Sequence, residues 1–122
     1  MTKEREDQFK RFLEARRAKL LLEIAAERER LSAQHYSDPM DHSRGLADRE
    51  IVMNNLVRLF EAHDAADQAL AEIHGQTFGV CASCGNEIPT KRLEAVPWSR
   101  FCVSCQEMAE RQESEIGYSL PN

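Results

Sequence analysis

Apolar residues recur along the first part of the chain at the period of an α-helix. These residues are Phe9, Leu13, Leu20, Ile24 and Leu31, and they are 4, 7, 4 and 7 positions apart. The stretch from about residue 4 to 34 contains no Gly or Pro and is rich in Glu, Arg, Ala and Leu, which favour helix. This spacing keeps the apolar residues on one stripe, while the other faces are charged. The pattern therefore predicts one long amphipathic helix.

A second apolar seam runs from about residue 46 to 74. Its members step alternately by 4 and 3 residues: Val52, Leu56, Leu59, His63, Ala66, Leu70 and Ile73. Between the two seams, residues 35–45 contain Pro39, Gly45 and several turn-forming residues. Two long helices joined by a short connection run antiparallel and bury their seams against each other. We therefore predict a helical hairpin of the coiled-coil type for residues 1–74, with its tip near residues 36–45.

The four cysteines of the chain form two close pairs, Cys81-x2-Cys84 and Cys102-x2-Cys105, with 17 residues between them. Each pair lets two thiolates bind one metal ion from a tight turn. Two pairs at this separation are typical of a tetrahedral site with four sulfur ligands, which zinc prefers. Because four thiolates leave no open coordination position, we predict one structural Zn2+ rather than a catalytic one. Gly85 follows the first pair, where a positive φ helps the backbone to turn.

Two other uses of the cysteines are weaker interpretations. A pair of disulfides needs an oxidising compartment, but the densely charged N-terminal segment lacks the apolar core of a signal peptide. A thioredoxin-like redox pair would lie in a βαβ pattern, and the sequence shows none. Zinc remains the favoured interpretation.

The remainder of the chain, residues 75–122, is predicted to be a zinc-finger unit followed by a short C-terminal helix from about residue 103 to 115. The segment around the cysteines has few apolar residues, so zinc binding supplies much of its folding free energy, on the order of 10–16 kcal/mol in model fingers. The predicted fold class is therefore mainly α: a long antiparallel helical hairpin with a small C4 zinc-finger unit.

Composition narrows the classes of function. Charged residues make up 30% and aromatic residues 7% of the chain, which suits long solvated helices. The net charge of −5 disfavours direct specific DNA binding, because a phosphate-binding surface is normally basic. No apolar run is longer than three residues, so we expect no membrane span. With no nucleophile–base pair and no cofactor loop visible, we expect a cytoplasmic binding protein and not an enzyme.

Two distant parts of the chain carry distinctive motifs. Around the cysteines they are Phe78-Gly79-Val80, Gly85, Ile88, Arg92-Leu93-Glu94-Ala95 and Pro97, and at the tip Asp38-Pro39-Met40-Asp41. Both motifs resemble those of one known family, the DksA/TraR C4 zinc-finger proteins, whose tip is also acidic. The resemblance runs from about residue 36 to 112, and the N-terminal part matches only in being helical.

The resemblance implies a function. Members of the family bind bacterial RNA polymerase and not DNA. Their coiled coil inserts into the secondary channel, through which nucleotides reach the catalytic centre, and the acidic tip comes near that centre. The zinc unit stays outside, and the effect is to change the stability of promoter complexes.

Individual residues match positions that matter in the family. Asp38 and Asp41 match the two tip aspartates, and Ser43 lies where the family often has Ala. Asn55 and Arg58 match positions that contact the rim of the polymerase. Plainer roles remain open, since Asp41 at the start of a helix can also cap backbone N–H groups, and Asn55 and Arg58 can be ordinary surface residues.

Dependence on the alarmone ppGpp is expected to be weak or absent. In ppGpp-responsive members of the family, basic side chains at three positions hold the alarmone against the polymerase. The matching positions here are Ala65, Val96 and Gln106, and none is charged. Lys91 and Arg92 lie nearby in the sequence and could compensate in part.

Two functions of other classes remain open. The chain could be a Gre-like stimulator of transcript cleavage, with tip carboxylates that hold a Mg2+ ion at the polymerase active site. It could also be a zinc-stabilised coiled-coil adapter for a partner other than polymerase.

Overall fold

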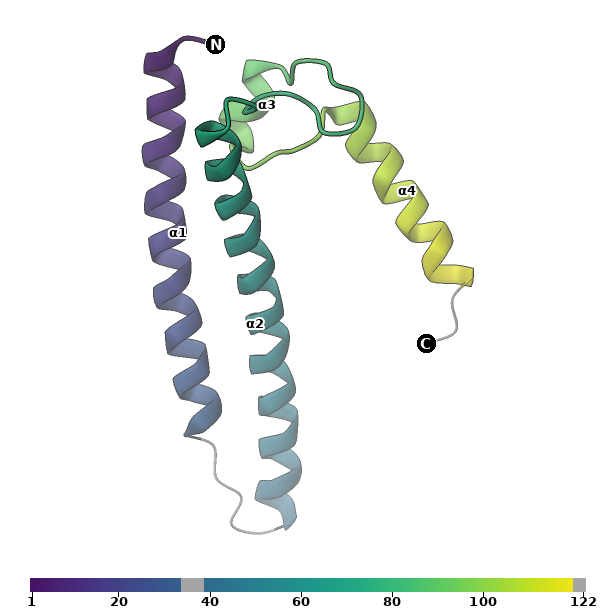
Figure 1. Ribbon diagram of the computed structural model, residues 1–122. Helices are drawn as coiled ribbons and strands as arrows, with labels where there is room; N and C mark the ends of the chain where they lie inside the picture. The colour runs from purple at the N-terminus through teal and green to yellow at the C-terminus, as the bar shows by residue number, and fades with distance from the viewer. Residues whose placement is uncertain (34–38, 120–122) are drawn as a thin grey trace. The chain divides into compact units, whose positions relative to one another are not determined.

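The computed structural model describes residues 1–33 and 39–119, with side chains for residues 1–33 and 44–113. This part of the chain is mainly helical (Figure 1), with α1 Lys3–Ser32, α2 Pro39–His74, α3 Thr90–Ala95 and α4 Val103–Ser119. Extended pairing within it is limited to one antiparallel bridge between Val80 and Glu87. The predicted mainly α fold class is confirmed. No helix in the described residues is long and apolar enough to cross a membrane.

The chain divides into two compact units. The first, here called the hairpin unit, is Arg11–Gln68; the second, called the base unit, combines Met1–Lys10 with Ala69–Asn122. Both long helices therefore contribute residues to both units. The sequence predicts a division at residue 74 in chain order, and that boundary stays a prediction.

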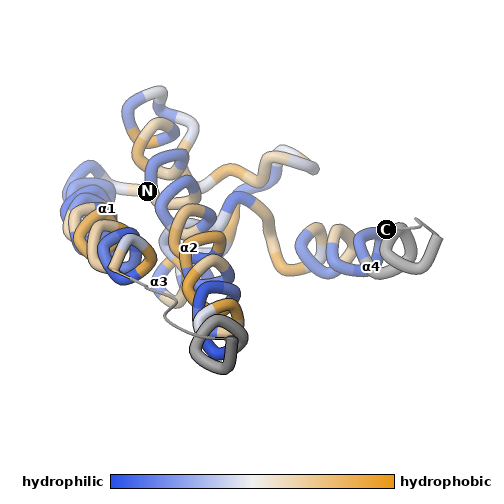
Figure 2. The backbone as a smooth tube through the Cα atoms, turned by 90° about the horizontal axis from the view of Figure 1, so that it is seen from below, coloured by the Kyte–Doolittle hydropathy of each residue, from blue (hydrophilic) through white to orange (hydrophobic). Residues whose placement is uncertain are grey.

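In the hairpin unit, α1 and α2 run antiparallel and bury the two predicted stripes against each other. Ile24, Val52 and Leu56 form the core cluster, with exposed fractions of 4%, 2% and 6%, and the partly buried Leu31 and Leu59 pack against it. Apolar and polar segments alternate along both helices in Figure 2. The seam is thus built as its spacing predicts, from apolar residues at every third or fourth position.

Polar contacts across the hairpin unit lie beside this seam. Arg17 Nη1 donates to Asp67 Oδ1 at 2.7 Å, and the guanidinium of Arg28 lies 5.2 Å from the ring centroid of Phe60. Both residues of the ion pair are well exposed, so the pair contributes only about 0–1 kcal/mol. The pair therefore adds little to the stability that the apolar seam gives the two helices.

The connection between the long helices is shorter than predicted. Helix α2 begins at Pro39 and not near residue 46, so the second half of the predicted break is helical. Proline suits the first helical position, because its φ is already helical and its missing N–H would have no partner there. Gly45 is then accommodated inside the helix at a cost of about 1 kcal/mol relative to Ala.

The base unit has a small apolar core. Phe9 and Ile73 from the long helices are buried, as are Ile88 and Leu93. The ring of Phe9 lies 5.4 Å from that of Phe78, centroid to centroid. The short helix α3, which the sequence did not predict, follows Pro89 and buries Leu93 completely. Helix α3 therefore serves to hold one large side chain in this core.

The seam gives a first testable prediction. Leu13 has no exposed surface, whereas Leu22 on the same helix is 73% exposed. Leu13→Ala should lower the free energy of unfolding by about 2–5 kcal/mol, because it removes buried methyl groups and leaves a cavity. Leu22→Ala, the matched control, should change it by less than about 0.5 kcal/mol. Urea unfolding followed by circular dichroism at 222 nm measures both, and equal losses would contradict the assignment of the seam.

Candidate functional site

The first cysteine pair lies on a narrow turn closed by backbone hydrogen bonds. The N–H of Cys81 donates to the carbonyl of Asn86 at 2.8 Å, and that of Ile88 donates to Gly79 at 2.7 Å. Gly85 closes the turn with a φ of 76°, a conformation that L side chains rarely adopt. The expected role of Gly85 in turning the backbone is therefore confirmed.

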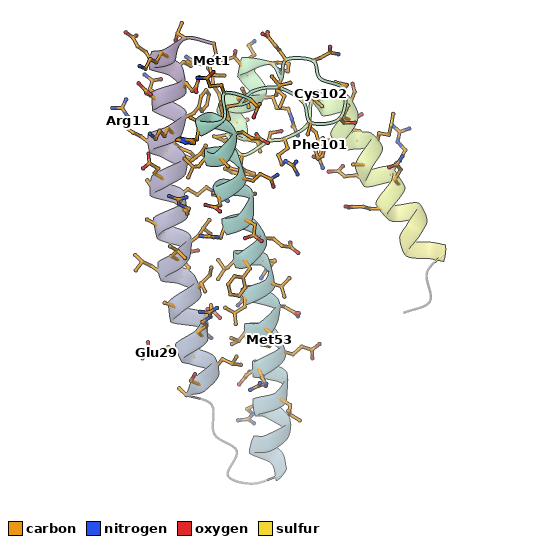
Figure 3. All side chains as sticks on the ribbon, viewed as in Figure 1. Met1, Arg11, Glu29, Met53, Phe101 and Cys102 are labelled. Atoms are coloured by element: carbon orange, nitrogen blue, oxygen red, sulfur yellow. The ribbon has the colours of Figure 1, made fainter. Side chains whose placement is uncertain are left out.

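The second cysteine pair lies at the start of α4. The N–H of Gln106 donates to the carbonyl of Cys102 at 2.9 Å, which begins the helical hydrogen bonds. A further bond, from the N–H of Ala82 to the carbonyl of Arg100 at 2.8 Å, ties the two cysteine-bearing segments together. Residues far apart in the sequence are thereby brought side by side, as seen around Cys102 in Figure 3.

The four sulfur atoms form one compact cluster. All lie within 4.8 Å of one another, and Sγ of Cys84 is 3.9 Å from Sγ of Cys102. Four sulfurs at about 2.3 Å around one zinc ion are about 3.8 Å apart, so the cluster has the size of a tetrahedral zinc site. A disulfide requires about 2.05 Å, and all four cysteines are free thiols.

Electrostatics also favour a cation at the cluster. Backbone N–H groups of Cys84, Cys102 and Ser83 point at the sulfur of Cys81 and lower its pKa to about 6. Hydrogen bonds to Cys102 and then to Cys81 raise the pKa of the Cys105 thiol to about 12, since its proton is shared with neighbouring sulfurs. Four thiolates this close together repel one another unless a cation balances their charge. The cluster is therefore suited to a structural zinc ion.

A hollow of about 340 Å³ lies beside α4 in the base unit. Its walls include Val96 and Gln106, two of the three positions at which the family resemblance led us to look for basic residues. Two arginines also line it, Arg92 and Arg100. The Nε of Arg92 donates to the carbonyl of Phe101 at 3.4 Å. The third position, Ala65, belongs to the hairpin unit.

Arg100 is a functional candidate that the sequence analysis missed. Its Nε lies 3.5 Å from Oε1 of Glu72, whose pKa is raised by burial and lowered less strongly by Arg100. The only sequence signal was its position two residues before Cys102, which by itself does not predict a neighbour on α2. Any positive charge that the hollow offers a ligand therefore comes from Arg92 and Arg100.

In the hairpin unit, Asn55 and Arg58 lie together. Arg58 Nη2 donates to Asn55 Oδ1 at 2.5 Å. Both line a hollow of about 530 Å³ between the helices, with Arg16, Leu20, Glu23, Ala26, Glu27, Leu59 and Ala62. The family resemblance pointed to the two α2 residues, and their role stays a prediction. Their neighbours on α1 could not be predicted, because the register between the helices is not visible in the sequence.

The acidic tip lies partly outside the described residues. Asp38 lies outside the described residues. Asp41 and Ser43 fall in the first turns of α2, but their side chains are also outside the described part of the structure. The roles assigned to these three residues therefore stay predictions.

The zinc site gives a second testable prediction. Cys84 is exposed, so Cys84→Ser removes one ligand with little loss of packing. We expect zinc to be lost, the fluorescence of Trp98, the sole tryptophan, to change, and most helical signal to remain. Ser104→Ala, an exposed change on α4, is the matched control and should keep zinc. Metal analysis that found one zinc per chain in the Cys84 variant would contradict this assignment.

Comparison with known proteins finds similarity both at the zinc finger and along most of the chain. The prokaryotic dksA/traR C4-type zinc finger matches residues 76–111, which include all four cysteines. The RNA polymerase-binding transcription factor DksA of Salmonella typhimurium is 31% identical over 110 residues, which cover 88% of this chain and 73% of that protein. An uncharacterized protein of Aquifex aeolicus is 46% identical over 56 residues, which cover 46% of this chain and 37% of that protein.

A solved structure agrees with these sequence matches. Transcription factor DksA2 from Pseudomonas aeruginosa superposes with a TM-score of 0.82 at 26% identity, covering 93% of this chain and 89% of that one. The agreement therefore extends beyond the zinc finger to the helices that precede it. The four-sulfur site, the zinc-finger match and the similarity to DksA together show that the chain belongs to the DksA/TraR family.

Proposed function

We propose that this protein is a bacterial transcription regulator that binds RNA polymerase directly, acts in the cytoplasm and has no enzyme activity of its own. The observation that carries the proposal is the similarity to the polymerase-binding DksA of Salmonella typhimurium, which extends over 88% of the chain. That length includes the long helices as well as the cysteines, which supports a mode of binding shared with that protein.

In this proposal the hairpin enters the secondary channel and brings Asp38, Asp41 and Ser43 near the catalytic centre. A helical hairpin is about 20 Å across, and α1 with its 30 residues is about 45 Å long. The charge of the tip then acts on the polymerase and changes the stability of promoter complexes. A carboxylate at the start of α2 is also stabilised by the positive end of the helix dipole.

Docking is assigned to residues away from the tip. Asn55 and Arg58 contact the polymerase rim, with Asn55 fixing the orientation of Arg58 through the 2.5 Å hydrogen bond. The zinc ion, held by Cys81, Cys84, Cys102 and Cys105, has a structural role only, because four sulfur ligands leave it no open position. The net charge of −5 supports contact with protein and not with DNA phosphates.

The direct test is binding to purified bacterial RNA polymerase core enzyme. We expect co-purification and a change in promoter-complex lifetime when the protein is added. Failure to bind would favour an adapter for another partner and would sink the proposal. Stimulated cleavage of the transcript in a stalled complex would instead favour the Gre-like function, in which two tip carboxylates hold Mg2+.

Asp41→Asn tests whether the effect on promoter-complex lifetime can be separated from binding to RNA polymerase. Asparagine keeps the size and capping ability of aspartate but removes its charge. We expect polymerase affinity to change by less than about threefold, while most of the effect on promoter-complex lifetime is lost. Asp48→Asn, an exposed change on the same helix, is the matched control and should keep both. If affinity and effect fall together in the Asp41 variant, Asp41 is a docking or structural residue.

Weak dependence on ppGpp is a further expectation. Each charge-assisted contact to a phosphate contributes about 1.5–3 kcal/mol, so neutral residues at Ala65, Val96 and Gln106 remove most of the affinity at that interface. With a polymerase that lacks its other alarmone site, ppGpp should add little to the effect of the protein. Strong synergy in such a transcription assay would show that the missing charges are supplied from elsewhere, and Arg92 and Arg100 are the candidates that line the hollow.

A gain-of-charge pair sharpens this test. Gln106→Lys adds one positive charge to the wall of the hollow, whereas Met108→Lys adds one to an exposed position two residues further along α4, which does not line it. Only the first should increase the response to ppGpp. Equal responses would point to a general charge effect.

A further inference from the structure

Helix α2 carries a second apolar stripe outside the buried seam. Its members, at spacings of 7, 4 and 3, are Leu46, Met53, Val57 and Phe60, with exposed fractions of 49%, 43%, 52% and 38%. The last three each follow a seam residue by one position, which places them about 100° further around the helix. The stripe therefore lies beside the seam, on one face of the hairpin unit, and we call it the stripe face.

The stripe face is distinct from the hollow that contains Asn55 and Arg58. Asn55 precedes the seam residue Leu56, whereas Val57 follows it, so the two lie on opposite sides of the seam. Arg28 reaches Phe60 from α1 on the stripe side, at 5.2 Å from the ring centroid. The hairpin unit thus has a hollow on one side of the seam and an apolar stripe on the other.

Acidic residues accompany the stripe on its outer edge. Glu50 and Asp64 each lie four residues after a stripe residue, as does Glu61, and all three are exposed. Within the described part of the chain, no ion pair involves Glu50 or Glu61. The outer edge therefore presents the carboxylates of Glu50 and Glu61 to a partner, while the exposed Arg49, three residues after Leu46, lies on the inner side of the stripe.

We propose that the stripe face is a second docking surface, which takes an α-helix of RNA polymerase with apolar residues at heptad spacing and basic side chains beside them. This inference rests on the function proposed above. Spacings of 7, 4 and 3 match the seam of a helix packed knobs-into-holes, which selects a helical partner. The acidic edge selects basic side chains on that helix.

The same charges argue against a second copy of this chain as the occupant. When two α2 helices pack stripe against stripe and antiparallel, their acidic edges come together, and each copy has a net charge of −5. A basic helix neutralises that edge. Arg28 over Phe60 shows that the stripe already accepts a guanidinium against its aromatic ring.

Val57→Asp and Leu22→Asp form a matched pair of variants. Both residues are exposed aliphatics on the long helices, with exposed fractions of 52% and 73%, but Leu22 lies two residues after the buried Leu20 of α1 and so away from both the stripe and the hollow. We expect Val57→Asp to weaken binding to RNA polymerase core enzyme by about tenfold or more, because a charge enters an apolar contact. Leu22→Asp should stay within about threefold. Circular dichroism verifies that both variants keep the helical content of the parent.

A second test concerns the carboxylates of the acidic edge and does not depend on the apolar contact. The double variant Glu50→Gln with Glu61→Gln should bind more weakly at low salt and lose less affinity than the parent as salt rises. Asp48→Asn, on the other side of the seam, should leave the salt dependence unchanged. An unchanged salt dependence in the double variant would overturn the assignment of a basic partner helix.

The outcomes separate this inference from the proposed function. If the parent protein binds polymerase and Val57→Asp binds equally well, the stripe face is not a docking surface, although the proposed function stands. If both aspartate variants lose affinity equally, the assignment of docking to the stripe face is also refuted. If the parent does not bind at all, the proposed function itself fails. A parent dimer in sedimentation that Val57→Asp converts to monomer would show that a second copy covers the stripe.

Discussion

The four sulfur atoms that share one cation are the constraint on which the base unit depends. Between residues 75 and 113 the large buried apolar side chains are few, with Ile88 and Leu93 the main ones. Neither cysteine-bearing segment can therefore be held in place by apolar packing alone. Once the sulfurs share a zinc ion, the narrow turn at Gly85 and the start of α4 become fixed to each other. Zinc supplies here the free energy that a larger domain obtains from burial.

Those parts of the fold that rest on local periodicity could be predicted from the sequence. The two helices followed from apolar spacing, because a residue such as Leu56 is buried only when the helix turns it toward its partner. The metal site followed from cysteine spacing, because a pair two residues apart can bind one ion from a single turn. In both cases the relevant contacts are set within a few residues of the chain, so a pattern in the sequence is sufficient.

Features that depend on distant neighbours could not be predicted in the same way. Helix α3 is held by the burial of Leu93, which is a property of the folded core and not of six residues in isolation. The contact of Arg100 with Glu72 requires the register between the zinc-finger segment and α2. The early start of α2 at Pro39 was missed because proline and glycine both mark breaks, although proline also suits the first helical position.

Stability and recognition are assigned to different faces of the same helix. Val52 and Leu56 are buried and stabilise the hairpin unit, whereas Met53 and Val57, one position along, remain largely exposed. An exposed aliphatic side chain gains little free energy from folding, since it stays in contact with water. Apolar residues that keep heptad spacing on such a surface therefore add little to the stability of the chain itself. Their regular spacing acquires an energetic consequence only when a helical partner covers them, and the two adjacent stripes thus divide folding from docking.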